Sequence, residues 1–288
     1  MKVALIGTGL MGRPMAERLL SAGYQVWVFN RSREKAESLR SAGAEIALSA
    51  AEAIQSARCV ILMLADASAI RQVIFDREQE PELSGRTVIQ MGTISPSESI
   101  HFHKAVRARG GDYLEAPVIG SIPEVTAGNL LVMVGGSQSQ FDRWSGLLEC
   151  FGPNPLLIGE VGKASALKLA MNQLISSLTA GFSLSLGFVQ KYDIEVDLFM
   201  KILRQSALYA PTFDKKLQRM LNRDYTRPNF PGKHLAKDLR LFQTEAEALG
   251  LELSTVEGLR RILALTFEAG FAEGDYSALY EAVNPAGH

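Results

Sequence analysis

Short apolar runs alternate with helical patterns through the first half of the chain. Residues 2–6 form an apolar run that ends at Gly7, apolar side chains then recur at helical spacing up to Leu20, and a second run follows at 24–30. Five later runs resemble strands, several of them separated by helical segments: 59–64, 86–91, 111–116, 130–136 and 154–159. This alternation predicts an α/β fold with a mostly parallel, doubly wound sheet.

From Lys163 onward the pattern changes to helical periodicity. The segments that show it are 163–191, 196–206, 233–250 and 255–270. We therefore expect two domains, an α/β domain over residues 1–161 and an all-α domain over residues 162–288 that is built on the long helix. Residues 169–190 carry no charge, but several polar side chains among them favour a helix buried against protein over a membrane span.

The turn after the first predicted strand has the sequence Gly7-x-Gly9-x-x-Gly12. A predicted helix follows it, and this is the context of a dinucleotide-binding motif. Gly7 would form the tight turn, Gly9 would let the backbone approach a pyrophosphate, and Gly12 would let the helix pack on the strand. We expect this segment, including Leu10 and Met11, to bind a cofactor. The alternative is a glycine-rich turn that binds no ligand.

The end of the second predicted strand indicates which dinucleotide binds. A chain that binds NAD usually has Asp or Glu here, which accepts a hydrogen bond from the ribose 2′-hydroxyl. This chain has Asn30, Arg31 and Ser32, all of which can donate to a 2′-phosphate. NADP(H) is therefore the predicted cofactor. The alternative is that Arg31 belongs to a surface turn and that the chain accepts either cofactor.

Charge and composition argue against other classes of protein. The 30 basic and 31 acidic residues are mixed along the chain and give a formal net charge of −1, which does not favour a nucleic acid or an anionic membrane as partner. Cys59 and Cys150 form no disulfide framework, which favours a reducing, cytoplasmic location. His101 and His103 would point apart on a helix, so no metal site is predicted.

Lys168 lies between Leu167 and Leu169 in the long predicted helix. On that helix Ser165, Lys168 and Asn172 fall near one face. A lysine in such a polar seam would be partly desolvated, which lowers its pKa and makes it a usable proton donor near neutral pH. Asn172 could hydrogen-bond a substrate or orient the ammonium. Spacing alone leaves open the alternative that Lys168 reaches the surface or pairs with an acid.

Six ordered segments carry a family resemblance over almost the whole chain. They are GTGLMGRPMA near the start, MLAD at 63–66, GTISP at 92–96, EAPVIGS at 115–121, GKASALKLAMNQL at 162–174 and FPGKHLAKDLRL at 230–241. With them the chain resembles the β-hydroxyacid dehydrogenase family, and most of all its glyoxylate/succinic semialdehyde reductase branch. The resemblance implies a Rossmann-like domain followed by an all-helical domain, a substrate cleft between the two, and a homodimer or homotetramer.

The resemblance also implies roles for single residues. Lys168 matches the family's catalytic lysine, which gives a proton to the carbonyl oxygen as hydride from nicotinamide reaches the carbon, and Asn172 matches the asparagine that supports it. Thr93 matches a residue near both nicotinamide and substrate, and Lys237 matches a lysine that contacts the cofactor. The loop expected to lie along the dinucleotide contains Leu64 and Ala65.

The substrate implied by the resemblance carries a carboxylate, because the family's loop after APV binds one. Here the backbone N–H of Gly120 and the hydroxyl of Ser121 could hold it. The sequence departs from the family at Ile119, where the usual serine donor is lost, and at Glu124 and Val125, where small residues are usual. These departures leave the identity of the substrate open.

Two residues of the helical half also match positions that border the substrate in the reductase branch. They are Phe230 and Asp238, and the alternatives are core packing for Phe230 and a surface ion pair with Lys237 or Arg240 for Asp238. His234, beside Lys233, could lie at the entrance of the implied cleft, but no role is predicted for it.

The predicted function is the NADPH-dependent reduction of a small aldehyde acid, such as succinic semialdehyde or glyoxylate, to the hydroxy acid. The alternative with the same chemistry is an NAD(P)-dependent dehydrogenase of the 3-hydroxyisobutyrate or tartronate semialdehyde type. The alternative from another class is a non-catalytic dinucleotide-binding protein, which Lys168 and Asn172 argue against because binding alone needs no proton donor. Imine reductases share the implied architecture but typically lack the family's lysine.

Overall fold

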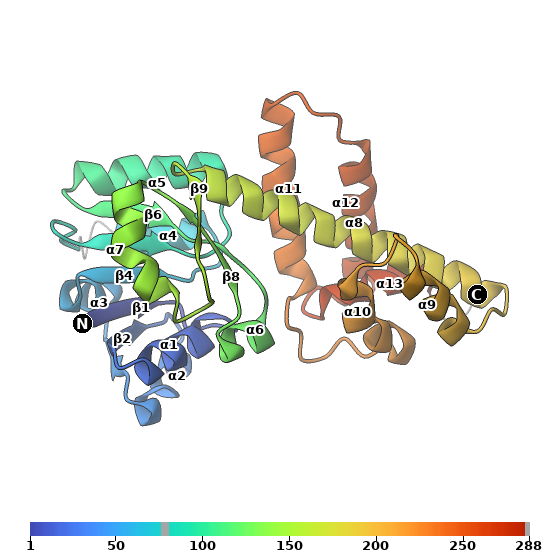
Figure 1. The fold of residues 1–288 in the computed structure, drawn as a ribbon, viewed down its shortest axis with the longest axis horizontal. Helices are drawn as coiled ribbons and strands as arrows, with labels where there is room; N and C mark the ends of the chain where they lie inside the picture. Colours follow the sequence, from blue (N-terminus) through green and yellow to red (C-terminus); the bar gives the residue numbers. More distant parts are fainter. Residues whose placement is uncertain (76–80, 286–288) are drawn as a thin grey trace. The chain divides into compact units, whose positions relative to one another are not determined.

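The computed structural model describes residues 1–75 and 81–285. The chain forms two compact units, Met1–Lys168 and Leu169–His288, which are described separately below (Figure 1). The sequence places a domain boundary after residue 161. The division between the units falls a few residues later, inside the long helix α8 (Lys163–Lys191).

The first unit contains a sheet with the strand order β3-β2-β1-β4-β5-β6-β8-β7, and β9 pairs with β8. Neighbours from β3 to β6 are parallel, whereas β8 is antiparallel to both β6 and β7. The strands are β1 (Lys2–Ile6), β2 (Gln25–Phe29), β3 (Glu45–Ile46), β4 (Cys59–Leu62), β5 (Thr87–Gln90), β6 (Asp112–Glu115), β7 (Val118–Ile119), β8 (Leu131–Gly135) and β9 (Leu156–Gly159). The predicted fold class is confirmed, and β3 and β7 are additions to the predicted strands.

Helices cover both faces of this sheet (Figure 1). One face packs against α1 (Gly12–Ser21), α6 (Ile122–Ala127) and α7 (Gln138–Leu148). The other face packs against α3 (Ala50–Ser56), α4 (Ala67–Ile74) and α5 (Pro96–Ala108). The short helices α2 (Arg33–Glu37) and η1 (Arg40–Ala42) follow β2. Buried apolar layers on both faces explain why the strands read as continuous apolar runs rather than alternating ones.

Strand β1 shows how one apolar run supplies both layers. Val3 and Leu5 join the hydrophobic cluster on the α1 side, and Ala4 and Ile6 join the cluster on the α3 side. All four side chains are at most 1% exposed, because successive residues of a strand point to opposite faces. The strand therefore ends, at Gly7, with its backbone fixed from both sides.

The second unit is helical, as the periodicity predicts. Its helices are the part of α8 from Leu169 onward, α9 (Val196–Gln205), α10 (Pro211–Asn222), α11 (Gly232–Ala248), α12 (Ser254–Glu268), η2 (Tyr276–Ala278) and α13 (Leu279–Val283). The sequence did not single out α10 as a separate helix. Two hydrophobic clusters hold the unit together, one between α8, α11 and α12 and one between α8, α9, α10 and α13. None of the helices in the described ranges combines the length and the hydropathy needed to cross a membrane.

Candidate active site

The predicted cofactor residues of the first unit follow the carboxyl ends of neighbouring parallel strands. Gly7 follows β1, Asn30 follows β2, Leu64 lies just after β4, and Thr93 lies just after β5. The chain order reverses between β1 and β4, since β2 and β3 extend the sheet on one side of β1 and β4 begins the other side. Ligands of open α/β sheets bind outside the carboxyl ends at such a switch point.

The glycine-rich turn after β1 is tightly packed at Gly7 and Gly12 and open at Gly9. Gly7 has φ +99°, and a Cβ atom on it would lie 2.3 Å from the Met63 carbonyl oxygen. A Cβ on Gly12 would lie 1.8 Å from the Gly7 carbonyl oxygen, so the first turn of α1 can approach the strand only without a side chain. At Gly9 a Cβ would meet nothing within 4 Å, and the nearby Thr8 hydroxyl is buried without a partner among the described residues. An open backbone beside a helix start fits a dinucleotide phosphate.

Asn30 connects the glycine-rich turn to the end of β2. Its Oδ1 accepts a hydrogen bond from the backbone N–H of Thr8 at 3.0 Å, and its Nδ2 donates to the carbonyl of Ser32 at 2.9 Å. The sequence predicts Asn30 as a donor to the cofactor, and the structure shows that its amide also links Thr8 to Ser32. Arg31 and Ser32 are exposed, which leaves their donors accessible for a 2′-phosphate.

The loop that carries Thr93 is fixed by a buried amide. Gln90, 1% exposed, donates from Nε2 to the Gly92 carbonyl at 2.8 Å and accepts from the Gly92 N–H at 3.0 Å. A Cβ on Gly92 would lie 2.4 Å from the Leu64 carbonyl oxygen, so the loops after β4 and β5 touch. Thr93 is half-buried beside this contact. Among the remaining predicted cofactor contacts, the exposed ones are Leu10 and Ala65, and the half-buried ones are Met11 and Leu64.

The ammonium of Lys168 is held against the sheet. Its Nζ donates a hydrogen bond to the carbonyl of Val118 in β7 at 2.7 Å. Because β6 and β7 are both antiparallel to β8, they run in the same direction, and β7 ends at the edge where the predicted cofactor loops lie. The side chain is half-buried. Lys168 therefore lies beside the loop of Gly120 and Ser121 that follows β7.

A buried carboxylate fixes the helix that carries Lys168. Glu115, the last residue of β6, is 1% exposed, and its Oε1 accepts from the backbone N–H groups of Gly162, Ala164 and Ser165 at 2.8, 2.9 and 3.1 Å. Its Oε2 accepts from the hydroxyls of Ser165, at 2.6 Å, and Ser99. A negative charge at the first turn of α8 interacts favourably with the helix dipole. The segment 115–118 thus holds both the backbone of α8 and the Lys168 ammonium.

The predicted substrate loop already holds a carboxylate of the chain itself. Glu124 Oε2 accepts from the backbone N–H and from the hydroxyl of Ser121, at 2.8 Å each. Gly120 has φ +129°, and a Cβ on it would lie 3.0 Å from Glu124 Cβ. The Ser121 hydroxyl is thus engaged by Glu124, so a substrate carboxylate would have to displace Glu124 to reach this donor, and the predicted role of Ser121 stays a prediction.

In the helical unit, Asn172 and Asp238 are buried partners, 3% and 2% exposed. Asn172 Nδ2 donates to Asp238 Oδ2 at 2.6 Å, and Lys237 Nζ lies 2.9 Å from Asp238 Oδ1. The ion pair with Lys237 that the sequence offered as an alternative exists, but it is not on the surface. Phe230 is half-buried, with ring contacts to His234 and Tyr276 at centroid distances of 6.4 and 5.9 Å.

The predicted residues thus form two groups, one in each unit. In the first unit, Lys168 and the loops after the strands form one group, and these loops are Gly7–Gly12, Asn30–Ser32, Leu64–Ala65, Thr93 and Gly120–Ser121. In the second unit, Asn172, Lys237 and Asp238 form the other group. Sequence reasoning missed the roles of Glu115 and of the Glu124 side chain. The sequence does contain a signal for Glu115. It is an acidic residue at the end of an apolar strand, and a buried carboxylate there requires hydrogen-bond donors from another segment.

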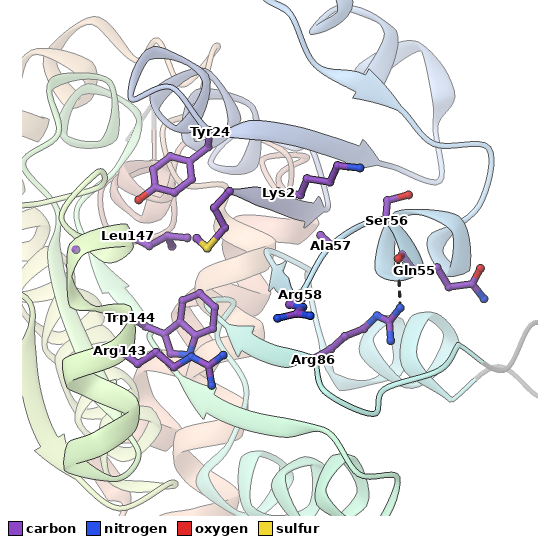
Figure 2. Close-up of a pocket in the computed structure, with 12 residues that line it drawn as sticks. Lys2, Tyr24, Gln55, Ser56, Ala57, Arg58, Arg86, Arg143, Trp144 and Leu147 are labelled. Atoms are coloured by element: carbon purple, nitrogen blue, oxygen red, sulfur yellow. Dashed lines mark hydrogen bonds between the residues drawn. The ribbon is translucent and has the colours of Figure 1, made fainter.

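A cavity of about 780 Å³ lies at a different place in the first unit (Figure 2). Lys2 begins β1, and Arg58 and Arg86 directly precede β4 and β5, so the cavity lies at the amino ends of the strands whose carboxyl ends carry the predicted loops. Arg143 and Trp144 of α7 line it as well. Arg86 donates to the carbonyls of Ile54 and Gln55 near the end of α3 at 2.9 and 3.2 Å. None of the predicted site residues lines this cavity.

Comparison with known proteins gives matches over nearly the whole chain. Residues 2–159 match a family model described as the NAD-binding domain of 6-phosphogluconate dehydrogenase, and residues 162–283 match one described as the NAD-binding domain of NADP-dependent 3-hydroxyisobutyrate dehydrogenase. The chain is 30% identical to glyoxylate/succinic semialdehyde reductase 1 of Arabidopsis thaliana, with 98% of each chain covered. It is 32% identical to 2-hydroxy-3-oxopropionate reductase of Escherichia coli, with 98% of this chain and 97% of the relative covered.

A solved structure shows the same fold. The crystal structure of a 3-hydroxyisobutyrate dehydrogenase from Salmonella typhimurium superposes with a TM-score of 0.87 at 25% identity, covering 98% of this chain and 99% of that chain. Together with the two family models, these matches show that the chain belongs to the β-hydroxyacid dehydrogenase family of NAD(P)-dependent oxidoreductases, to which the 3-hydroxyisobutyrate dehydrogenases belong.

Proposed function

We propose that the chain reduces a small aldehyde acid of the succinic semialdehyde or glyoxylate type to its hydroxy acid, with NADPH as the reductant. The observation that carries the proposal is the hydrogen bond from Lys168 Nζ to the Val118 carbonyl, 2.7 Å long. It holds an ammonium at the sheet edge where the loops after β1, β2, β4 and β5 converge. A proton donor beside a nicotinamide site is the arrangement that carbonyl reduction requires.

The cofactor preference is supported by the residues after β2. NADPH bound at the glycine-rich turn supplies the hydride. Arg31 and Ser32 would donate to its 2′-phosphate, and no carboxylate stands at position 30 to repel that group. The remaining cofactor contacts in the proposal are Gly7, Gly9, Leu10, Met11, Gly12, Asn30, Leu64, Ala65, Thr93 and Lys237.

Lys168 is the proposed acid. Its ammonium would transfer a proton to the carbonyl oxygen of the substrate, and the Val118 carbonyl would orient the ammonium before that step. Asn172, one turn later in α8, is the proposed supporting residue, and Asp238 fixes its amide through a 2.6 Å hydrogen bond. The other proposed substrate contacts are Thr93, Gly120, Ser121, Phe230 and Asp238.

The second candidate is an NAD(P)-dependent dehydrogenase of the 3-hydroxyisobutyrate or tartronate semialdehyde type, which includes the oxidative direction. The similarity to a 2-hydroxy-3-oxopropionate reductase and to a 3-hydroxyisobutyrate dehydrogenase favours it. In that direction Lys168 would accept the proton of the alcohol. The same residues serve both directions, so the two candidates differ in substrate and not in mechanism.

The two parts of the chain have different proposed roles. We assign most of the cofactor contacts to residues 1–161, and oligomerisation and part of the substrate contacts to residues 162–288. A homodimer or homotetramer is supported by apolar side chains that the helical unit leaves exposed, among them Leu184 and Phe188 of α8, 60% and 62% exposed. The absence of a disulfide between Cys59 and Cys150 supports a cytoplasmic location.

The test is the initial rate of NADPH oxidation with succinic semialdehyde and with glyoxylate, each repeated with NADH. Turnover with NADPH that exceeds turnover with NADH is the expected result. Reduction of NAD(P)⁺ with 3-hydroxyisobutyrate, or oxidation of NAD(P)H with tartronate semialdehyde, without turnover of the other two aldehyde acids would replace the proposal with the second candidate. NADPH binding without turnover of any of these compounds would identify a non-catalytic dinucleotide-binding protein.

A further inference from the structure

Both polar hydrogens of Ser121 point to a single carboxylate oxygen. The backbone N–H and the hydroxyl donate to Glu124 Oε2, each at 2.8 Å. Glu124 is half-buried, and its stem packs under Gly120, where a Cβ atom would lie 3.0 Å from Glu124 Cβ. A backbone N–H and a hydroxyl that converge on one oxygen are the donors that a bound carboxylate would use.

This pair of donors belongs to the loop that directly follows β7, the strand that the proposed proton donor contacts. Ser121 is three residues beyond Val118, whose carbonyl accepts the hydrogen bond from Lys168 Nζ. All of these residues belong to the first unit. A substrate with its carbonyl at Lys168 and its carboxylate at Ser121 would therefore meet the Glu124 carboxylate in the position that its own carboxylate needs.

The contact between Glu124 and Ser121 also caps the N-terminus of α6. Elsewhere in the chain an uncharged side chain makes the same kind of cap. Glu124 is the third residue of α6, and its side chain accepts from the N-cap backbone N–H as in a capping box. At the start of α7 the same position is Gln140, whose Oε1 accepts from the Ser137 N–H at 2.8 Å. An amide therefore suffices for the cap, and the negative charge at Glu124 is not needed for it.

We propose that Glu124 determines substrate specificity at this loop by standing in for the substrate carboxylate. An acid substrate must displace Glu124 from Ser121, and two carboxylates then lie close together and repel each other. An uncharged aldehyde of the same length meets no such cost. Glu124 therefore weakens the binding of an acid substrate relative to an uncharged one of the same length, and loss of the Glu124 charge strengthens the binding of the acid. The inference rests on the proposed aldehyde reduction.

The first test compares kcat/KM for succinic semialdehyde and for its uncharged amide, 4-oxobutanamide, in the wild type and in Glu124→Gln. We expect kcat/KM for succinic semialdehyde to rise about 10-fold or more, mainly through KM, and kcat/KM for the amide to stay within about twofold. Glu98→Gln is the matched control, because Glu98 forms the equivalent cap with Ser95 at the start of α5. An unchanged ratio of the two substrates in Glu124→Gln would overturn the proposal.

The second test separates failure of the inference from failure of the proposed reaction. Succinate, which has a carboxylate but no aldehyde, is titrated into the NADP⁺-saturated protein, and its Kd is measured by calorimetry. Glu124→Gln is expected to bind succinate about 10-fold more tightly than the wild type, whether or not any aldehyde is reduced. Equal Kd values would refute the role of Glu124. A tighter Kd without turnover would refute only the proposed reaction.

Discussion

Glu115 accepts two hydrogen bonds from Ser165, one from its backbone N–H at 3.1 Å and one from its hydroxyl at 2.6 Å. The two residues join the end of β6 to the first turn of α8, 50 positions apart in the chain. Gly135 in β8 leaves room for this contact, since a Cβ there would lie 2.4 Å from Glu115 Oε1. The position of Lys168 in α8 therefore depends on a carboxylate that has no proposed role in the chemistry.

Replacement of Glu115 by alanine is expected to destabilise the chain by about 3 kcal/mol or more. Three backbone N–H groups, two in the first turn of α8 and one at Gly162 just before it, lose their acceptor in a buried place, and each unsatisfied donor costs about 1–3 kcal/mol. The measurement is the free energy of unfolding from urea titration. Glu115→Gln keeps the Oε1 acceptor and is expected to lose less. A loss below about 1 kcal/mol in the alanine variant would contradict this account of the contact.

Replacement of Lys168 by alanine tests the proposed proton donor. The rate kcat is expected to fall by about 10²- to 10⁴-fold, the usual contribution of general acid catalysis, while the Kd of NADPH stays within about twofold. Lys163→Ala is the matched control, because Lys163 is an exposed lysine in the first turn of the same helix. Near-normal turnover in Lys168→Ala would remove Lys168 from the mechanism.

Replacement of Arg31 by alanine tests the cofactor preference. We expect the Kd of NADPH to rise about 10-fold or more and the Kd of NADH to change little, because only NADPH has a 2′-phosphate. Fluorescence titration with each cofactor gives both values. Arg33→Ala is the matched control, since Arg33 lies two residues later and pairs with Glu37 at 3.0 Å. Equal losses for the two cofactors would show that Arg31 does not recognise the 2′-phosphate.

Asn30→Asp is a different experiment from Arg31→Ala because Asn30 has two structural hydrogen bonds. The aspartate would keep the acceptor for the Thr8 N–H and lose the donor to the Ser32 carbonyl. We expect NADPH to bind more weakly through repulsion of the 2′-phosphate, and NADH to keep most of its affinity. The ratio of the two Kd values measures the charge effect, and a fall in melting temperature reports the lost Ser32 contact.

Local pattern was sufficient to predict most elements of the fold. The apolar run of β1 and the glycines after it identify a strand, a turn and a helix, because each depends on residues close in sequence. Strand β7, with only Val118 and Ile119, is too short to show a period. The order of the strands in the sheet depends on pairing between distant segments. The hydrophobic periodicity of each segment carries no information about that pairing.

The side-chain partners of the site were not predictable in the same way. Glu115 finds its donors at Gly162, Ala164 and Ser165, about 50 residues away, and no local spacing links these segments. Glu124 was noticed as a departure from the family, but its contact with Ser121 depends on how α6 begins. The sequence therefore identifies the residues of the loop after β7. Only the structure shows that the hydroxyl and backbone N–H of Ser121 donate to Glu124.

We expect His234 to make the stability of the chain depend on pH. Burial lowers the pKa of its imidazole below the usual 6.5, and the charges of Lys237 and Lys233 lower it further, while Asp238 and Glu273 act in the opposite direction. The ring also stacks on Phe230 at 6.4 Å between centroids. The unfolded chain therefore binds a proton more readily than the folded chain, so stability is full above about pH 6.5 and falls as the pH drops below it.

Replacement of His234 by glutamine should remove this part of the acid sensitivity. We expect the wild type to lose more unfolding free energy than His234→Gln between about pH 7.5 and pH 5.5, by no more than about 1.4 kcal/mol for each pH unit, the limit for one proton. Urea titration at each pH gives the values. His101→Gln, at an exposed histidine of α5, is the matched control for the loss of an imidazole. A His234→Gln slope equal to that of the wild type would show that His234 has nearly the same proton affinity in the folded and unfolded chain, against the burial described here.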